Sequence, residues 1–264
     1  MQTSQKLLDL LPVLRDTAVK AGDAINEIRG TLEHVEEKAD GSPLTRADQA
    51  SHDAIVPVLE KLALPYTVIS EEGDLSKADH CPDSYWLVDP LDGTKEFIKG
   101  LDDFTVNIAL VLDKQPALGV VYLPANGSMY WAVKGEGAWR QNAGESEPQE
   151  LTAPGSPDPL TAVMSRSHGD AKTKEFLERL GVKNTIARGS SLKLCAVAEG
   201  SADIYPRFGP TWYWDTAAGG AVAMEAGCVL TNPDGSPFDY DLNRAMKHYG
   251  FVLYTPKTCQ PFGG

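Results

Sequence analysis

Residues Ser84–Phe97 read SYWLVDPLDGTKEF, and this stretch decides the fold of its region. The apolar run Tyr85–Val88 is followed at once by a segment of turn-forming residues. Apolar runs of roughly four to eight residues, bounded by turn residues, are typical of buried strands. The sequence therefore predicts a buried strand that ends in a turn carrying two carboxylates, Asp89 and Asp92.

Length and charge narrow the class of protein. The 264 residues suffice for one large domain or two of ordinary size, and no apolar run approaches the length of a membrane span. The N-terminus lacks the pattern of a secretory signal, so we expect a cytoplasmic protein. A net charge of −13 argues against a nucleic-acid surface, but a small anionic ligand could bind at a local island of positive charge. The four scattered cysteines suggest neither a zinc site nor a disulfide framework.

The first half of the chain combines helices with a meander of strands. Apolar residues at helical spacing predict helices over 7–28 and about 47–62, separated by a polar hinge at 36–43. A short strand is expected at 66–69, and a helical turn at 95–99. Apolar segments separated by turn residues then predict an antiparallel meander. Its strands are 105–112, 117–123, 129–133 and 138–141.

A polar stretch at 142–159, rich in Pro, Gly, Ser and Glu, is the best candidate for a domain boundary. We therefore expect an N-terminal α+β domain at 1–155 and a C-terminal α/β domain at 156–264. The second half alternates strands and helices, which is typical of α/β proteins. Its predicted strands are 160–164, 184–187, 202–205, 228–231 and 251–254, and its predicted helices are 170–180, 192–199 and 215–226.

Acidic residues recur where predicted strands end or predicted helices begin. They are Asp48, Glu71 with Glu72, Asp89, Asp92 and Asp215. Carboxylates that approach one another without basic partners need a cation between them. Hard oxygen ligands favour Mg²⁺, Mn²⁺ or Ca²⁺, and two such ions about 4 Å apart can clamp the oxygens of a phosphoryl transfer. The pattern therefore indicates a site for hard divalent cations that could serve phosphoryl transfer.

Each acidic residue also has a purely structural explanation. Asp92 and Asp215 could be helix N-caps, the Glu71–Glu72 pair could be a solvated turn, and Asp48 could complement a helix dipole. These explanations do not account for the joint pattern of strand, DPLDGT and turn. The sequence contains no GxxxxGK[ST], GxSxG or HExxH motif. In the Asp-x-Asp-Gly-Thr phosphatases the nucleophile stands two residues before the second Asp, where this chain has Pro90.

Three segments together resemble a known family. WLVDPLDGTKEF at 86–97, SEEG at 70–73 and WDTAAGGAVAMEAG at 214–227 resemble the lithium-sensitive, magnesium-dependent phosphatases related to inositol monophosphatase and fructose bisphosphatase. The resemblance covers nearly the whole chain. It implies a layered α-β-α-β-α sandwich, with an α+β N-terminal half and an α/β C-terminal half.

The resemblance also implies roles for individual residues. Two or three Mg²⁺ ions would bind, and Asp92 would bridge two of them. Thr94 with Asp48 would orient and deprotonate the attacking water. Whether Asp48 or Glu71 accepts the proton stays open. Gly93 allows close backbone approach, and the N–H groups that follow Thr94 suit a phosphate. The implied metal ligands are Glu71, Asp89, the carbonyl of Leu91, Asp92 and Asp215.

Motifs in the second half narrow the substrate. SRSH at 165–168, GSSLK at 189–193 and YPR at 205–207 look like the bacterial 3′(2′),5′-bisphosphate nucleotidase branch. That branch converts adenosine 3′,5′-bisphosphate into AMP and phosphate in sulfate assimilation. By the resemblance, Ser190, Lys193 and Arg207 would hold the 5′-phosphate side of the substrate, and His168 would lie against the adenosine. The substrate would also lie near Gly93, Thr94 and Asp215.

Several alternatives stay open at this point. An inositol-phosphate or other sugar-phosphate monoesterase would use the same carboxylates, and a non-catalytic nucleotide-binding or metal-binding regulator would need no turnover. Trp212 and Trp214 could stack a base or pack around Asp215. The resemblance allows peripheral association with the inner membrane, and no protein or nucleic-acid partner is implied.

Overall fold

A computed structural model describes most of the chain. The described residues are 2–29, 35–37, 43–64, 66–79, 81–153, 159–166, 171–256 and 260–262. Within these ranges, no helix combines the length and apolar composition that a membrane crossing needs.

The N-terminal region differs in detail from the sequence prediction. The expected helix over 7–28 is broken into α1 (Gln2–Leu8) and α2 (Leu11–Ile28). Pro12, in the first turn of α2, explains the break, because it has no N–H to donate to the carbonyl of Leu8 and its ring clashes with that carbonyl. The helix α3 (Arg46–Leu59) begins near the predicted residue, includes Pro57, and ends three residues early.

The predicted polar hinge at 36–43 is partly wrong. Its described ends belong to two short paired strands, β1 (Val35–Glu37) and β2 (Pro43–Thr45), which run antiparallel. Residues 38–42 lie outside the described part of the chain. The β2 strand leads directly into α3, so it fixes where that helix begins.

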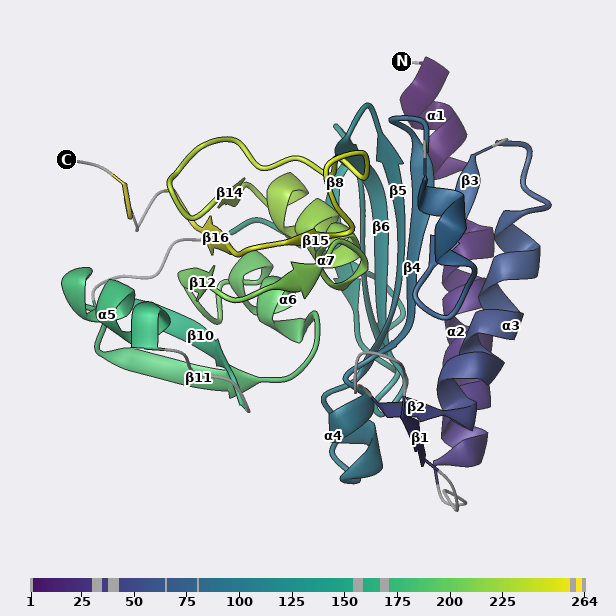
Figure 1. Cartoon of the computed structure of the whole chain (residues 1–264), viewed down its shortest axis with the longest axis horizontal. Coiled ribbons are helices and arrows are strands. Elements are labelled where there is room, and N and C mark those ends of the chain that lie inside the picture. Colours follow the sequence, from purple (N-terminus) through teal and green to yellow (C-terminus); the bar gives the residue numbers. More distant parts are fainter. Residues whose placement is uncertain are drawn as a thin grey trace.

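A seven-stranded sheet forms the larger β layer (Figure 1). Its strands follow chain order, and all neighbours are antiparallel except the first two, which are parallel. The predicted meander is confirmed, but the polar stretch at 142–159 also contributes an unpredicted seventh strand. The strands are β3 (Thr67–Ser70), β4 (Tyr85–Asp92), β5 (Thr105–Leu112), β6 (Gln115–Leu123), β7 (Ser128–Val133), β8 (Gly137–Gln141) and β9 (Gln149–Leu151).

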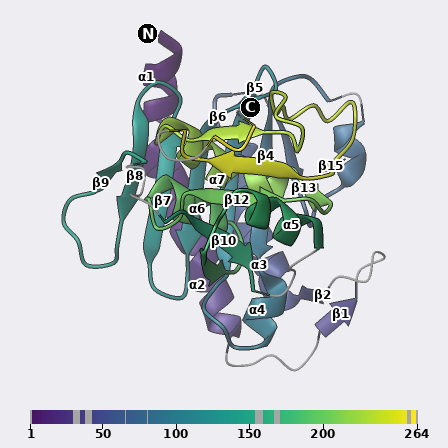
Figure 2. The same ribbon diagram turned by 90° about the vertical axis from the view of Figure 1, so that its left-hand side faces the viewer.

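The second half builds a smaller, five-stranded sheet, which lies in front of the larger one in Figure 2. β10 runs parallel to both of its neighbours, and β16 runs antiparallel to both of its own. The predicted α/β alternation is confirmed. In spatial order the strands are β11 (Asn184–Arg188), β10 (Thr161–Ser165), β12 (Ile204–Arg207), β16 (Phe251–Tyr254) and β14 (Val229–Thr231).

Helices complete five layers (Figure 1). α2 and α3 cover the outer face of the large sheet, and α6 (Leu192–Ala198) and α7 (Trp214–Glu225) lie between the two sheets. The short helix α5 (Ala171–Arg179) packs on the far side of the small sheet. The expected α-β-α-β-α sandwich is therefore confirmed.

The sequence of α7 explains why it occupies the central layer. A helix buried on all sides must be apolar or small all round, and nearly every residue of α7 is buried. Gly119 of β6 permits close packing, because a Cβ atom there would lie 2.5 Å from the carbonyl oxygen of Ala218. One apolar core joins both halves, and the proposed domain boundary near residue 155 stays a prediction.

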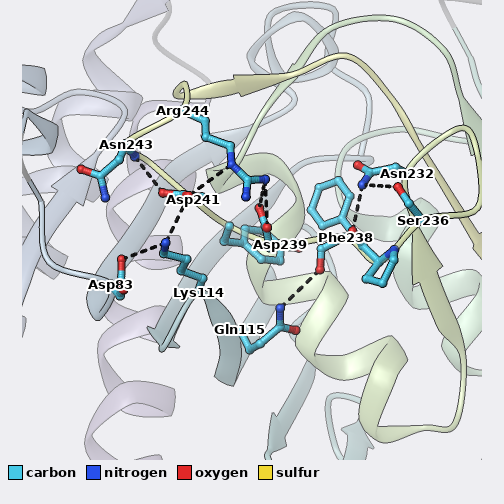
Figure 3. A network of polar contacts seen from close by, with 12 residues as sticks. Asp83, Lys114, Gln115, Asn232, Ser236, Phe238, Asp239, Asp241, Asn243 and Arg244 are labelled. Atoms are coloured by element: carbon cyan, nitrogen blue, oxygen red, sulfur yellow. Dashed lines mark hydrogen bonds and ion pairs between the residues drawn. The ribbon is translucent and has the colours of Figure 1, made fainter.

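Ion pairs also join the two halves (Figure 3). Lys114, in the β5–β6 turn, places Nζ 3.2 Å from Asp241 and 3.3 Å from Asp83. Arg244 approaches Asp241 at 3.3 Å. The loop anchored in this way continues into β15 (Lys247–His248), which pairs with β13 (Thr211–Trp212). The β13 strand immediately precedes α7, so this network supports the start of the central helix.

Candidate active site

The strand β4 does not end at Val88 as the sequence predicted. It continues to Asp92, and the pairing with β5 becomes irregular between Asp89 and Asp92. Such a bulge leaves residues without ladder partners. Pro90 is accommodated there because its missing N–H breaks no sheet hydrogen bond. Asp89 and Asp92 therefore lie within the last residues of β4, and the bulge between them changes the direction in which their side chains point.

A sharp turn follows the bulge. Gly93 has a φ of 95°, in the left-handed region, and a Cβ atom there would lie 2.8 Å from the carbonyl oxygen of Asp103. Thr94 begins the short helix α4 (Thr94–Ile98), close to the predicted helical turn. Glycine is thus required at residue 93 by both conformation and space.

The predicted pair of Asp48 and Thr94 lies together. Thr94 Oγ1 donates to Asp48 Oδ1 at 3.0 Å and is also 3.2 Å from the carbonyl oxygen of Leu91. The second oxygen of Asp48 accepts from both the backbone N–H and the hydroxyl of Thr45, each at 2.7 Å. Asp48 is buried and belongs to a capping box, so the helix-terminus interpretation and the site interpretation both apply.

Two further acids arrive from separate elements. Glu71 follows β3, and its backbone N–H donates to the carbonyl of Val88 at 3.1 Å, next to the β4 bulge. Asp215 lies in the first turn of α7 and accepts from the N–H of Trp212 at 3.0 Å. The N-cap interpretation of Asp92 and Asp215 is wrong, because the N-caps of α4 and α7 are Gly93 and Tyr213.

Three of the carboxylates form a compact cluster. Asp89, Asp92 and Asp215 each offer one oxygen within 4.8 Å of the others. Burial, followed by repulsion from neighbouring acids, raises the pKa of Asp89 well above its ordinary value and that of Asp92 to about 7. Burial likewise raises the pKa of Asp215. An all-carboxylate donor set that resists ionisation without a counter-charge fits a hard cation, so the cluster can hold a metal ion.

The cluster opens into a pocket of about 270 Å³ that both halves line. Lys193 and Arg207 border the same pocket as Asp92 and Asp215. Lys193 is 7% exposed, and its Nζ donates to the carbonyl of Ser190, so the charge is held at the wall rather than in solvent. The structure therefore places carboxylates and cations side by side in one cavity.

The pocket also contains residues that the sequence did not single out as individual site residues. They are Lys95, Glu96, Ser165, Gly189 and Trp212. Lys95 and Glu96 adjoin the DPLDGT motif, Ser165 and Gly189 belong to the SRSH and GSSLK motifs, and for Trp212 the sequence left base stacking and packing as alternatives. The rings of Trp212 and Trp214 stack with their centroids 4.6 Å apart, and Lys247 Nζ lies 3.9 Å from the centroid of the Trp212 ring. These contacts support the packing interpretation. His168 lies outside the described residues.

The layered sandwich and the acidic cluster define a class of α/β protein that can hold a metal ion in a pocket lined by both halves of the chain. The chain belongs to the inositol monophosphatase family, whose model matches residues 6–248. This finding confirms the family resemblance that the sequence motifs indicated.

Within this family, the chain is similar to proteins named CysQ. The chain is 46% identical over 237 residues to the 3′(2′),5′-bisphosphate nucleotidase CysQ of Escherichia coli (strain K12), covering 89% of this chain and 95% of that protein. It is 38% identical to the CysQ nucleotidase of Buchnera aphidicola subsp. Acyrthosiphon pisum, covering 95% and 93%. The crystal structure of CysQ from Bacteroides thetaiotaomicron superposes with a TM-score of 0.79 at 39% identity, covering 91% and 94%.

Proposed function

We propose that the protein is a Mg²⁺-dependent phosphomonoesterase that hydrolyses adenosine 3′,5′-bisphosphate to AMP and phosphate. The observation that carries the proposal is the pairing of two unlike sites in one pocket, a carboxylate cluster and the cations Lys193 and Arg207. A substrate with two phosphates needs both sites, since a metal site can hold the reacting phosphate and a cationic site the other. The names of the similar nucleotidases support the same substrate class.

The carboxylate side of the pocket would hold two or three Mg²⁺ ions. The proposed ligands are Glu71, Asp89, the carbonyl of Leu91, Asp92 and Asp215, and their oxygens are the donors that Mg²⁺ prefers. Bound Mg²⁺ would act as a Lewis acid, stabilising charge on the reacting phosphate and lowering the pKa of water. Burial raises the pKa of Asp89, Asp92 and Asp215, that of Asp92 to about 7, so a bound cation would favour the ionised form of these carboxylates.

Thr94 and Asp48 would orient and deprotonate the attacking water. The hydrogen bond between Thr94 Oγ1 and Asp48 Oδ1 supports this role, because a water bound to the hydroxyl could pass its proton to the carboxylate. Glu71 also lines the pocket and is the alternative proton acceptor. Water would attack the 3′-phosphorus in line, and the 3′-oxygen would leave as an alcohol without a covalent enzyme intermediate.

The cationic side of the pocket would select the substrate. Ser190, Lys193 and Arg207 would contact the 5′-phosphate, and the guanidinium of Arg207 can bind phosphate bidentately. Gly93 and the backbone at Thr94 would approach the 3′-phosphate, beside Asp215. His168 would lie against the adenosine. A cytoplasmic location and a role in sulfur assimilation belong to the same proposal.

Phosphate release from two substrates tests the proposal. With Mg²⁺, we expect rapid release from adenosine 3′,5′-bisphosphate, a kcat/KM at least about tenfold lower for inositol 1-phosphate, and no release from either substrate in EDTA. Preference for inositol 1-phosphate would favour the sugar-phosphatase alternative. Tight binding of the bisphosphate without phosphate release would favour a non-catalytic regulator.

A further inference from the structure

Three polar residues alternate along the start of β5, in an otherwise apolar strand. Asp103 lies just before the strand, and Thr105 and Asn107 lie within it. Residues at i, i+2 and i+4 of an extended segment share one face. Thr105 and Asn107 are 0% and 1% exposed, so their polar groups require partners inside the protein. We call these three residues the polar ladder.

Each residue of the polar ladder bonds to the same turn, Gly189–Ser191. Asp103 Oδ2 accepts from the N–H of Gly189 at 2.8 Å. The hydroxyl of Thr105 lies 3.0 Å from that of Ser190 and 2.9 Å from that of Ser191. The hydroxyl of Ser191 also donates to Asn107 Oδ1 at 2.8 Å. The turn that precedes Lys193 is therefore held along its whole length by β5.

The polar ladder also adjoins the carboxylate cluster. Thr105 is the cross-strand partner of Asp92, and Asn107 is the partner of Asp89. The amide Nδ2 of Asn107 is 3.5 Å from Asp92 Oδ2, so this one side chain contacts both the carboxylate and the turn. The polar ladder thus lies between the two halves of the proposed active site.

The conformation of the turn depends on this support. Ser190 has a φ of 45°, which is uncommon for a residue other than glycine and persists only where the surroundings hold it. Gly189 fits tightly, because a Cβ atom there would lie 2.6 Å from Asp103 Cβ. Thr105 bonds to Ser190 directly, and Asp103 and Asn107 fix the residues on either side of it, while Lys193 donates to its carbonyl.

We propose that Asp103, Thr105 and Asn107 are positioning residues that fix the Gly189–Ser191 turn relative to Asp92. They thereby set the separation between the metal cluster and the second anionic site. The inference rests on the proposed function, since it assigns the turn and Lys193 to the 5′-phosphate. The side-chain hydroxyl of Thr105 bonds to the turn, whereas the side chain of Asn107 bonds to both the turn and Asp92, so the two residues have different expected effects.

Thr105→Val tests the turn side of the polar ladder without requiring turnover. Calorimetric titration with AMP in Mg²⁺ measures binding of the 5′-phosphate part alone. We expect AMP to bind about five- to tenfold more weakly, the loss that one buried hydrogen bond produces. Thr105→Ser should restore binding. Thr231→Val is the matched control, because the buried hydroxyl of Thr231 in β14 donates to the carbonyl of Val252 in β16, and neither residue lines the pocket.

Asn107→Leu tests the carboxylate side. Calorimetric titration with Mg²⁺ in the absence of nucleotide should show affinity reduced about fivefold or more, because Asp92 loses its amide partner. Thr105→Val should leave Mg²⁺ affinity within about twofold of the unaltered protein. This contrast separates specific positioning from general destabilisation, which would lower both affinities in both variants.

The outcomes distinguish failure of this inference from failure of the proposed function. AMP binding in Thr105→Val equal to that of the unaltered protein would overturn the polar ladder, even if the bisphosphate is hydrolysed. AMP binding that depends on Thr105, in a protein that releases no phosphate from the bisphosphate, would support the polar ladder and overturn the function. No AMP binding by the unaltered protein would overturn the polar ladder and the assignment of the 5′-phosphate to this turn, while phosphate release would still decide the function.

Discussion

Asp48 divides its two carboxylate oxygens between two tasks. One oxygen closes the capping box at the start of α3, and the other accepts from Thr94 at 3.0 Å. Its side chain is fixed on both sides, so it cannot turn away from the pocket without losing the cap. This arrangement gives a proposed proton acceptor a defined position before any substrate binds.

Asp48→Asn should separate the two tasks. Asparagine can still accept a backbone hydrogen bond at the helix start but cannot accept a proton. We expect kcat to fall by about 100-fold or more with little change in KM, and Tm to fall by only a few degrees. Asp53→Asn in the same helix is the control, because Asp53 is exposed. A kcat near that of the unaltered enzyme would leave Glu71 as the acceptor.

Lys193 carries its charge at a buried wall of the pocket. Replacement by methionine keeps most of the side-chain volume and removes the charge. We expect KM for the bisphosphate to rise by about tenfold or more, with a smaller effect on kcat, since a charge-assisted phosphate contact is lost. Steady-state kinetics measures both values. An unchanged KM would show that the 5′-phosphate lies elsewhere.

The helices and strands that were predicted correctly from the sequence are those whose position is determined by a local pattern of residues. Alternating apolar segments and turn residues located the meander, apolar spacing located α3, and the alternation of strands and helices located α7. The β4 bulge was missed, because a proline after an apolar run is equally typical of a strand end. β9 was missed because two of its three residues are polar and its pairing with β8 is set by the sheet rather than by the local sequence.

The site was predictable where a motif carries the chemistry, as at Asp92 and Thr94. The polar ladder was not, because Thr105 and Asn107 are ordinary strand residues until the Gly189–Ser191 turn is brought against them. Residues 84 positions apart in the chain meet there, as in the bond between Ser191 and Asn107. No local pattern encodes a contact of that kind, so only the packed structure shows it.

The strand β15 carries a buried histidine whose pKa makes it sensitive to acid. His248 donates Nδ1–H to the carbonyl of Gly250 and packs among Tyr213, Phe238 and Phe251. Burial lowers its pKa from 6.5 to about 4. The unfolded chain therefore binds a proton first, and stability is lost as pH falls from about 6.5 towards 4.

We expect this histidine to cost roughly 3 kcal/mol of stability between pH 7 and pH 4. His248→Phe removes the titration and keeps a ring. Urea unfolding at both pH values measures the free energy of unfolding, which should fall less between pH 7 and pH 4 in the variant than in the unaltered protein. The contributions of the other titrating groups are the same in both proteins and cancel in this comparison. An equal fall in both proteins would mean that His248 is not the responsible group.

At the scale of the whole molecule, the carboxylate cluster links pH to metal binding. The metal-free fold raises the pKa of Asp89, Asp92 and Asp215, chiefly through burial. A raised acid pKa means that the folded state holds protons which the unfolded state has released. The metal-free protein is therefore destabilised progressively as pH rises from about 4 through 7, the pKa of Asp92.

Mg²⁺ should reverse this penalty, and more strongly at higher pH. Below pH 7 a proton competes with the ion, so we expect Mg²⁺ affinity to be about tenfold weaker at pH 6 than at pH 8. Thermal unfolding with and without Mg²⁺ at the two pH values measures the effect through linkage. A shift in Tm of the same size at both would contradict the assignment of the cluster as the metal site.

In the proposed enzyme, one pocket joins a metal-dependent phosphatase centre to a second anionic site. The ratio of kcat/KM for adenosine 3′,5′-bisphosphate to that for adenosine 3′-monophosphate, measured in Mg²⁺, tests this arrangement. These substrates share base, sugar and leaving group and differ only in the 5′-phosphate. Two cationic contacts predict a ratio of about 100 or more. A ratio near one would contradict the account, because Lys193 and Arg207 would then make no use of the second phosphate.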